Sequence, residues 1–444
     1  MKKLLILFII YLTMALLTSQ IFADSELQPS ANIIDFYTVN DAITYAINNN
    51  LDVEQSKLQI EKSKYQIQSA VSMILPTIKL DALGGKLDYY TNRISFPGAP
   101  SETNYYQAKL SFNQLLFGTY ILPTLDIANL SYKASLDQLD ATKDLIAYQV
   151  NQLYYTILRT ANLKKIAEDS IQRNSDHLKT AEALFRIGIT TKANVLQTEA
   201  RLKDTEQKLT EADKFLKIAK VNFNLVLNRD LKKPFNLDDS DFSKIATKNL
   251  ENTSIDKLDI YINKAIQRPN IQILYKSKEI LGKTISIQQS NYYPSLFATG
   301  YYGFIDTNGF TTNRDNRDWL VAAGLSWTLF DGLGTSAKVS MAQNDYQRME
   351  KTVDQTEKFV YQEILDALLS INLAKQNMET SKVQIKFASE SYKLFREQFK
   401  AGLSTNQELL DAEYALSLAQ INYIDAIFDL ILARKKLEYL TNEI

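Results

Sequence analysis

The chain has 444 residues, in which 50 lysines and arginines nearly balance 51 aspartates and glutamates, and it contains no cysteine. The balanced charge argues against a nucleic-acid-binding protein, and the lack of cysteine excludes disulfides, thiolate metal sites and cysteine nucleophiles. Only 13 glycines and 8 prolines occur, so we expect long uninterrupted helices.

The first 23 residues are predicted to be a secretory signal peptide. Lys2 and Lys3 precede an apolar run from Leu4 to Leu17, and cleavage is expected after Ala23. The run is shorter than the roughly 20 residues that span a bilayer, although a short retained anchor is an alternative. Beyond it no stretch approaches about 18 uninterrupted apolar residues, so any membrane-spanning part is expected to consist of strands.

An internal duplication organises the rest of the chain. The segment Phe185–Thr191 is similar to Phe399–Thr405, and Leu116-Phe117-Gly118 is similar to Leu329-Phe330-Asp331-Gly332. Two further pairs keep the same order, namely Ile74-Leu75-Pro76 with Tyr292-Tyr293-Pro294 and Ala46-Ile47 with Ala265-Ile266. We therefore predict two structural repeats, residues 24–230 and 261–444, separated by a polar segment 231–260 that forms a collar.

Each repeat is predicted to contain a helix, two strands, a very long helix and a returning helix. In the first repeat the strands cover about 77–90 and 105–117, the long helix about 119–186 and the returning helix about 190–228. In the second repeat the same elements cover about 295–304, 319–330, 334–400 and 404–440. The predicted fold class is therefore mainly α with a smaller β part.

Apolar residues recur every seven positions along both long helices. The first carries Leu125, Tyr132, Leu139, Ile146 and Leu153, with a second stripe of Val150, Ile157, Ile171, Leu178 and Phe185. The second carries Val339, Tyr346, Val353, Val360 and Ala367, with a second stripe of Ile364, Ile371, Met378, Ile385, Tyr392 and Phe399. Two stripes on one helix indicate packing on both sides, as in a closed array of helices about 100 Å long. An ordinary amphipathic bundle without a conduit is the alternative.

The predicted strands alternate apolar with polar or small side chains. Tyr106, Ala108, Leu110 and Phe112 alternate with Gln107, Lys109, Ser111 and Asn113, and Trp319, Val321, Ala323 and Leu325 alternate with Leu320, Ala322, Gly324 and Ser326. This pattern is typical of membrane barrel strands, as are the long polar loops 91–104 and 306–318, although a soluble sandwich also alternates. Four strands cannot close a barrel, and an open edge cannot face lipid. Either the strands lie outside a membrane or several chains share one barrel.

These features together resemble the TolC outer-membrane efflux family. The resemblance covers essentially the whole mature chain and rests on the duplication and on a set of short marks. These marks are Pro76 and Pro294 at the first-strand entrances, Ala265–Asn270, Leu329–Gly332 and the Phe-x-x-Gly turns at Gly188 and Gly402.

The resemblance implies a homotrimer in which three chains share one twelve-stranded barrel in the outer membrane of a Gram-negative bacterium. A coiled-coil tunnel would continue the barrel through the periplasm. The implied partners are outer-membrane lipid, a periplasmic adaptor and an inner-membrane transporter. The implied function is the passive exit duct of a tripartite efflux or type I secretion system.

The resemblance also assigns roles to four residues. It places Gly188 and Gly402 at the periplasmic tip where the adaptor docks, although glycine at a helix end is also an ordinary left-handed cap. Glu408 and Asp411 lie on one helix face and match the acidic positions that ring the closed aperture of the family. Three copies would attract cations and raise the pKa of each carboxyl by mutual repulsion. The alternative is that acids in a first turn interact with the helix dipole.

One part of the family pattern is missing. The family's gate is held by a tyrosine and an arginine that bond an aspartate on a neighbouring helix. The matching positions here are Phe399, Ser404 and Asn194, which cannot form that charged lock. We therefore expect the closed state to be held differently or less firmly.

No catalytic, cofactor or metal site is predicted. His177, the only histidine, lies in the first long helix without cysteine or clustered carboxylates, and is expected to be a solvated helix residue. Phosphate-binding glycine loops and G-x-S-x-G elbows are absent, so the energy for transport is expected to come from a partner. We interpret the chain as a passive channel and not an enzyme. The alternatives are a periplasmic helical scaffold or adaptor without a channel, and a secreted binding or enzymatic domain.

Overall fold

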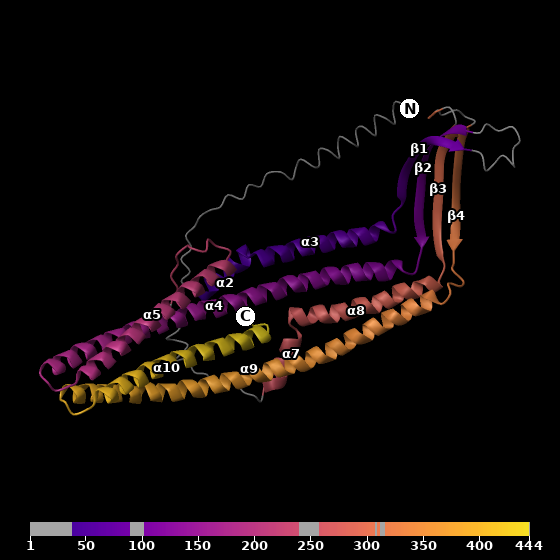
Figure 1. Cartoon of the computed structure of the whole chain (residues 1–444). Coiled ribbons are helices and arrows are strands. Elements are labelled where there is room, and N and C mark those ends of the chain that lie inside the picture. Colours follow the sequence, from indigo (N-terminus) through magenta and orange to yellow (C-terminus); the bar gives the residue numbers. More distant parts are fainter. Residues whose placement is uncertain (1–37, 89–101, 239–256, 307–308, 311–315, 444) are drawn as a thin grey trace.

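The computed structural model describes residues 38–88, 102–238, 257–306, 309–310 and 316–443. The molecule is elongated, with a sheet at one end and the turns of two helical hairpins at the other (Figure 1). The order of elements is repeated, and each repeat contains a helix pair, two strands, a long helix and a returning helix. This arrangement confirms the predicted fold class. The predicted signal peptide and most of both strand loops lie outside the described residues.

Each repeat opens with two helices that meet at a break. In the first, α2 (Val39–Asn49) ends before Asn50, whose extended backbone and side-chain oxygen cap α3 (Leu51–Ser72) through the amide of Asp52 at 2.8 Å. In the second, α7 (Leu258–Ile266) gives way to α8 (Pro269–Gln289). Arg268 is extended because it precedes a proline, and Pro269 occupies the first helical turn, where no amide donor is needed.

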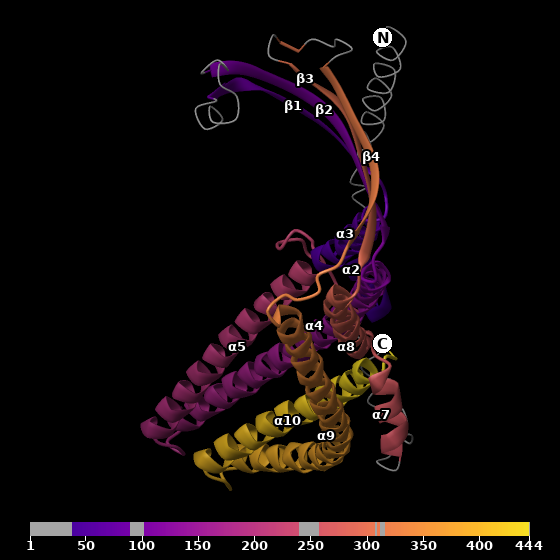
Figure 2. The same cartoon turned by 90° about the vertical axis from the view of Figure 1, so that its right-hand side faces the viewer.

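The four strands form one antiparallel sheet in the order β1-β2-β3-β4. Their bounds are Thr77–Asp88, Glu102–Phe117, Ser295–Asp306 and Arg317–Ser326. The first and third strands begin directly after Pro76 and Pro294. The pairing of β2 with β3 joins the two repeats, and the sheet is strongly curved (Figure 2). Within the described residues β1 and β4 each have one strand neighbour, so both outer edges are open.

The register separates the side chains of the sheet onto two chemically different faces. One face is apolar and exposed, and it carries Ile78, Leu80, Leu110, Phe112, Tyr302, Trp319 and Val321. The other face carries Lys79, Asp81, Lys109, Ser111, Tyr301 and Asp318, with Lys79 paired to Asp81 at 2.7 Å and the Tyr301 hydroxyl donating to Asp318 at 2.8 Å. The sheet therefore has the two-sided character that the alternation predicted.

The last strand is shorter than expected from the sequence. We predicted a strand to about residue 330, but β4 ends at Ser326, whose partner Ser295 is the first residue of β3. Among the described residues no strand pairs with residues 327–330, because β3 begins only after Pro294. The chain then turns through Gly332 and Leu333, both left-handed at φ 66° and 71°. The Asp331 carboxylate accepts from the Thr335 amide at 2.6 Å and so starts the next helix.

Two hairpins of long helices form most of the molecule. Helix α4 (Ile121–Arg186) returns through α5 (Lys192–Val226), and α9 (Gly334–Lys400) returns through α10 (Asn406–Leu440). The seven-residue stripes of the two long helices lie largely in contacts between helices. Their buried members include Ile146, Val150, Val353, Val360, Ile364 and Ile371. Helix α4 also contacts α8 near the sheet and α10 farther away, which joins the two repeats along their length.

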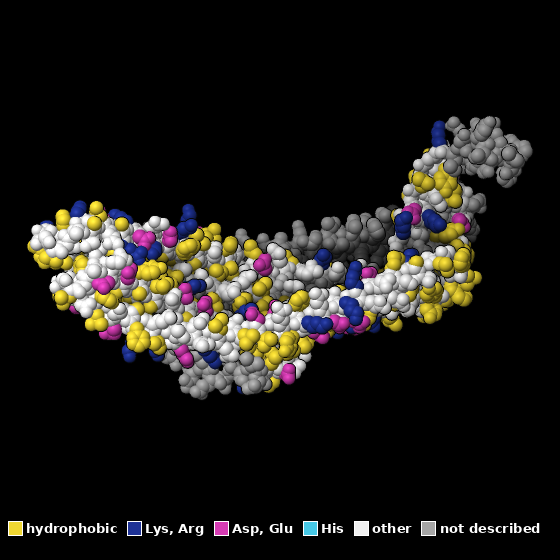
Figure 3. All heavy atoms as spheres, turned by 60° about the horizontal axis from the view of Figure 1, so that its bottom comes forward, with side chains coloured by type: hydrophobic (Ala, Val, Ile, Leu, Met, Phe, Trp, Pro, Cys, Tyr) yellow, Lys and Arg dark blue, Asp and Glu magenta, His cyan; other side chains and the backbone are white. Residues whose placement is uncertain are grey.

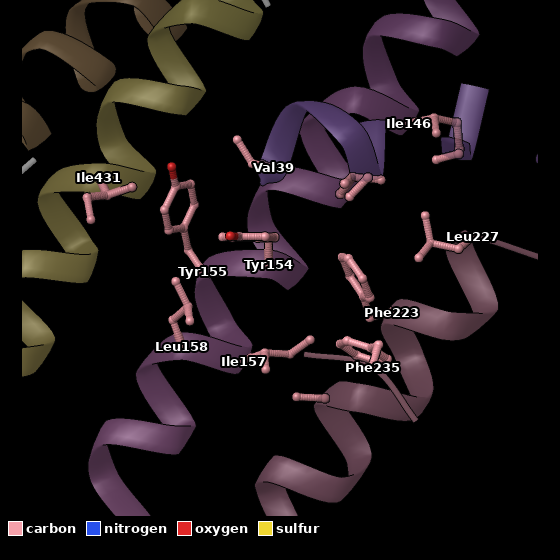
Figure 4. Close-up of a cluster of buried hydrophobic side chains, with 14 of the residues drawn as sticks. Val39, Ile146, Tyr154, Tyr155, Ile157, Leu158, Phe223, Leu227, Phe235 and Ile431 are labelled. Atoms are coloured by element: carbon pink, nitrogen blue, oxygen red, sulfur yellow. The ribbon is translucent and has the colours of Figure 1, made fainter. Parts of the chain in front are cut away.

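A large apolar cluster lies midway along the molecule. It gathers side chains from α2, α4, α5 and α10 around Tyr154 and Phe223, as Figure 4 shows. The described part of the predicted collar joins it, because Phe235 packs on Phe223 and the Tyr154 hydroxyl donates to the Asp238 carbonyl at 2.7 Å. This cluster holds the α4–α5 and α9–α10 hairpins together at the level of α2.

Among the described residues, one helix is long and apolar enough to cross a membrane by length and composition. It is α10, in which 39% of the most apolar window is buried. Helix α10 packs along α9 and α4, and its buried residues include Ile427, Phe428 and Leu430. We therefore interpret α10 as a core helix of the hairpins.

Apolar side chains also reach the surface over the sheet and along the helices (Figure 3). On the sheet, Leu80 and Val321 are 71% and 79% exposed, and on α9 Phe387 is 67% exposed. Contiguous apolar surface of this extent marks a protein or membrane contact. A single copy of the chain thus leaves both sheet edges and much apolar surface uncovered.

The junction of the two repeats gives a first prediction. A Cβ on Gly303 of β3 would lie 2.5 Å from the Ala108 carbonyl oxygen of β2. We expect Gly303→Ala to destabilise the folded protein by about 1–3 kcal/mol because the strands must move apart. Gly85→Ala on β1 is the control, since nothing lies within 4 Å of its added carbon. Thermal unfolding followed by circular dichroism measures both, and equal midpoints for the two variants would contradict the assignment of close packing at Gly303.

Candidate pore constriction and docking tips

The two hairpin turns are built alike. Gly188 and Gly402 have φ values of 77° and 74°, which favour glycine. In the first turn the Ile189 amide donates to the Leu184 carbonyl at 2.9 Å and the Gly188 amide to the Phe185 carbonyl at 3.0 Å. Leu403 and Gly402 repeat these two bonds in the second turn. This pair of bonds is the Schellman motif, which explains why each Phe-x-x-Gly segment ends a helix.

The tips expose apolar side chains. Leu403 is 80% exposed, and Ile187 and Ile189 are 68% and 60% exposed. No added carbon on Gly188 or Gly402 would meet a described atom within 4 Å, so both turns are open to solvent on that side. The geometry gives the glycines a structural role, and the exposed neighbours give the tips a surface on which another protein can pack.

Glu408 takes part in a capping box at the start of α10. Its carboxylate accepts from the Thr405 amide at 2.7 Å and from the Thr405 hydroxyl at 2.9 Å, while the Thr405 hydroxyl accepts from the Glu408 amide at 3.2 Å. The hydrogen bond from the Thr405 amide, and to a smaller extent the one from its hydroxyl, hold the pKa of Glu408 below its ordinary value. Within one chain, therefore, Glu408 lies in the first turn of α10, as the helix-dipole alternative expects, and it also caps that helix.

Asp411 lies one turn farther along α10, and its side chain is exposed. It accepts a hydrogen bond from Gln407 at 2.7 Å. Together with Tyr414 it lines an open groove of about 590 Å³ between α10 and α5, where Arg201 and Lys208 face it. Arg201 stacks over the Tyr414 ring at 4.8 Å. The carboxylate is thus accessible and has mixed charge around it.

The three positions that match the family's gate do not come together. Phe399 is buried in a tip cluster with Ala181, Leu409 and Leu416. The Ser404 hydroxyl donates to the Phe395 carbonyl at 3.2 Å, and the Asn194 amide side chain donates to the Thr190 hydroxyl at 2.8 Å. Ser404 and Asn194 are thus used within their own turns, whereas Phe399 packs across the junction against α4.

A buried polar layer that the sequence analysis missed joins the two hairpins. Glu413 of α10 is 3% exposed, and its Oε1 accepts from the Ser170 hydroxyl at 2.6 Å and from the Ser417 hydroxyl at 2.9 Å. Arg173 of α4 pairs with the same carboxylate at 3.3 Å and donates to Ser417 at 2.9 Å. A charged pair this deeply buried fixes the positions of both partners, because separating them leaves an uncompensated charge.

The layer continues toward the tips through uncharged groups. The Asn174 amide on α4 donates to the Thr205 hydroxyl of α5 at 3.3 Å. The Thr198 hydroxyl of α5 donates to Asn406 of α10 at 3.1 Å. The Asn406 amide in turn donates to Gln197 at 3.0 Å. Helices α4, α5 and α10 are therefore tied together by hydrogen bonds at this level.

The expectation for His177 was wrong. Its side chain is not solvated; it is 8% exposed and stands edge-on to the Phe399 ring, with the centroids 4.9 Å apart. The sequence signal was available in the spacing. Ser170 and His177, Thr198 and Thr205, and Asn406 and Glu413 each lie seven residues apart, which places polar residues on buried stripes of three helices.

Among the described residues, no group of three or more histidines, aspartates and glutamates is placed to hold a metal ion. The polar groups described at this end of the molecule form hydrogen bonds and ion pairs, and Asp411 presents an exposed carboxylate. Such groups can attract cations and dock helices.

Comparisons with known proteins match most of the chain. A family model described as outer membrane efflux protein matches residues 42–229 and 263–443. Outer membrane protein TolC of Vibrio cholerae serotype O1 is 21% identical over 371 residues, which cover 82% of this chain and 81% of that protein. Outer membrane efflux protein BepC of Brucella suis biovar 1 is 20% identical over 325 residues, covering 73% and 69%.

Solved structures share the fold at low sequence identity. The transmembrane channel CusC superposes with a TM-score of 0.79 and 17% identity over 94% of this chain and 95% of that one. The CmeC outer membrane channel of Campylobacter jejuni gives a TM-score of 0.78 and 16% identity over 91% and 85%.

The buried ion pair gives a second prediction. We expect Arg173→Ala to destabilise the protein by about 3–5 kcal/mol because it leaves the Glu413 carboxylate buried without its partner. The surface pair of Lys143 with Asp140, at 2.9 Å, supplies the control, and Lys143→Ala should cost less than about 1 kcal/mol. The double variant Arg173→Met/Glu413→Leu should recover most of the loss. Chemical unfolding curves measure all three, and an Arg173→Ala loss no larger than the control would show that the pair is dispensable.

Proposed function

The chain belongs to the outer membrane efflux protein family, and from this premise we propose that three copies assemble into one duct that carries cargo out of the periplasm. Family membership and the channel relatives place the chain in the outer membrane as an efflux channel. The number of copies, the partners and the pore residues belong to the proposal.

The observation that carries the proposal is the four-stranded sheet with two open edges and one apolar face. Backbone groups of an open edge cannot face hydrocarbon, because each unpaired group costs several kcal/mol there. Copies of the chain remove this problem if β4 of one copy pairs with β1 of the next. The apolar face then meets lipid, and the face with Lys109 and Asp318 lines the water-filled interior.

The helices support the same assembly. Helices α3, α4, α8 and α9 continue from the sheet, and the exposed apolar side chains along α5 and α9 are available for neighbouring copies. The tips would then converge at the far end of a tunnel. We propose that the exposed residues around Gly188 and Gly402 contact a periplasmic adaptor, which couples the duct to an inner-membrane transporter.

Transport through the duct is proposed to be passive. The relatives are channels, and we propose that the chain moves its cargo without transforming it, so the transporter supplies the energy. Glu408 and Asp411 of three copies would ring the narrow end. Mutual repulsion there would oppose the lowering of the Glu408 pKa that Thr405 causes. Opening would be a coupled shift of the packed hairpins. A periplasmic scaffold, the alternative, would have no use for the apolar sheet face.

Single-channel recording in planar bilayers tests the proposal. We expect discrete cation-selective steps from the purified protein and a several-fold fall in cation over anion permeability in Glu408→Ala/Asp411→Ala, because the ring loses its negative charge. Asp176→Ala on α4 removes an exposed carboxylate of the same charge and should leave selectivity unchanged.

The outcomes separate the parts of the proposal. Steps that the double substitution does not alter would keep the duct and remove the acidic ring. A folded protein that never inserts or conducts would remove the duct itself and favour the scaffold.

A further inference from the structure

His177 occupies the junction between the two hairpins near their tips. It belongs to α4, and the groups around its ring come from the opposite hairpin, namely Phe399 of α9 and Asn406 and Glu413 of α10. Its own hairpin closes the site with the buried Thr198 of α5, which is bonded to Asn406. The imidazole therefore touches the surface along which the hairpins dock.

The ring is held in its neutral form by this environment. The hydrogen bond with the Asn406 side chain favours the protonated ring, but no described residue bonds the Nε2 atom. The edge-on contact with Phe399 is apolar. A second proton on the ring would place a charge in a space that offers it little solvation, and this is costly unless the space opens to water.

The charged and titratable groups around the ring are few. From α10, Glu413 favours the protonated ring, but this carboxylate is already paired with Arg173 of α4. From α9, Tyr392 lies against Arg173, at 6.0 Å from its guanidinium, and burial raises the pKa of its phenol. From α5, Arg201 lies over the Tyr414 ring. Desolvation of His177, which lowers its pKa, outweighs the hydrogen bond with Asn406 and the attraction of Glu413, which both raise it.

We propose that His177 is a proton-sensitive latch between the α4–α5 and α9–α10 hairpins. The neutral ring fills the junction when the hairpins are docked, and its protonation favours hairpins that have moved apart and let water reach the ring. The role of the latch in transport rests on the proposed function, because separation of the hairpins would widen the tip of the duct. It would also supply a closed-state hold that Phe399, Ser404 and Asn194 cannot form as a charged lock.

The sign of the pH dependence follows from the two states. Burial lowers the pKa of docked His177 from 6.5 to about 4, whereas a ring in water keeps the ordinary value. Because the pKa of His177 is lower in the docked state than in water, the docked state has its full stability above pH 6.5. It loses stability as the pH falls from 6.5 toward 4, since protons then bind the separated state more tightly. Between pH 7.5 and pH 5.0 the docking equilibrium of one chain should therefore weaken by about 30-fold.

Distances between spin labels on the two tips test the latch. The chain has no cysteine, so Ile189→Cys and Leu403→Cys place one label on each exposed turn without further changes. The full-length protein is studied in lipid nanodiscs, with labelled chains diluted by unlabelled ones so that distances within a chain dominate. We expect one short distance at pH 7.5 and a second, longer population at pH 5.0.

Substitutions assign the response to the ring. His177→Gln keeps a hydrogen-bonding side chain that does not titrate, and His177→Leu fills the same space with an apolar one. Both should keep the short distance at pH 5.0. Circular dichroism of each variant confirms that it is folded.

Two results would overturn the latch: no change of distance in the parent protein between the two pH values, or an unchanged response in both His177 variants. The distances do not require conduction. A pH-dependent separation in a protein that fails to conduct would keep the latch and remove the duct, and conduction without any pH-dependent separation would do the reverse.

Discussion

An unpaired sheet edge cannot be left in hydrocarbon, and this constraint governs the rest of the structure. One chain supplies four strands with an apolar face, yet β1 and β4 each have a free side within the described residues. In the proposed assembly, neighbouring copies satisfy both edges at once. The duplication serves the same end, because two similar repeats, joined through β2 and β3, give each copy two nearly equivalent parts of one wall.

The helices extend this wall by a single packing rule. Apolar stripes of seven-residue spacing bury Val150 and Ile157 in α4, and Val360 and Ala367 in α9, so the same contacts can repeat over the whole length of a hairpin. Near the tips buried polar residues lie among the apolar ones. Apolar contacts tolerate small shifts, whereas the pair of Arg173 with Glu413 and the ring of His177 have defined partners. The region that would move in the proposed opening is thus the region whose docking is most specific.

Local patterns in the sequence predicted the elements well and their partners poorly. The long helix expected at 119–186 runs from Ile121 to Arg186. Its bounds were predictable because the glycines near its ends and its apolar period lie within or directly beside the segment itself. The end of β4 at Ser326 depends on where β3 starts, which its own sequence does not contain. His177 was misjudged for the same reason. Its burial comes from Phe399 and Asn406, more than 200 positions away, and only the seven-residue recurrence of polar residues hinted at it.

Amide hydrogen exchange of the sheet in lipid bilayers tests the shared barrel most directly. If neighbouring copies complete the sheet, the amides of β1 and β4 exchange as slowly as those of β2 and β3, since every strand then has two partners. Exchange at β1 and β4 that is faster by orders of magnitude, in protein shown to be folded and embedded in the bilayer, would mean that the edges are open. That result would contradict the shared barrel on which the account of the duct depends.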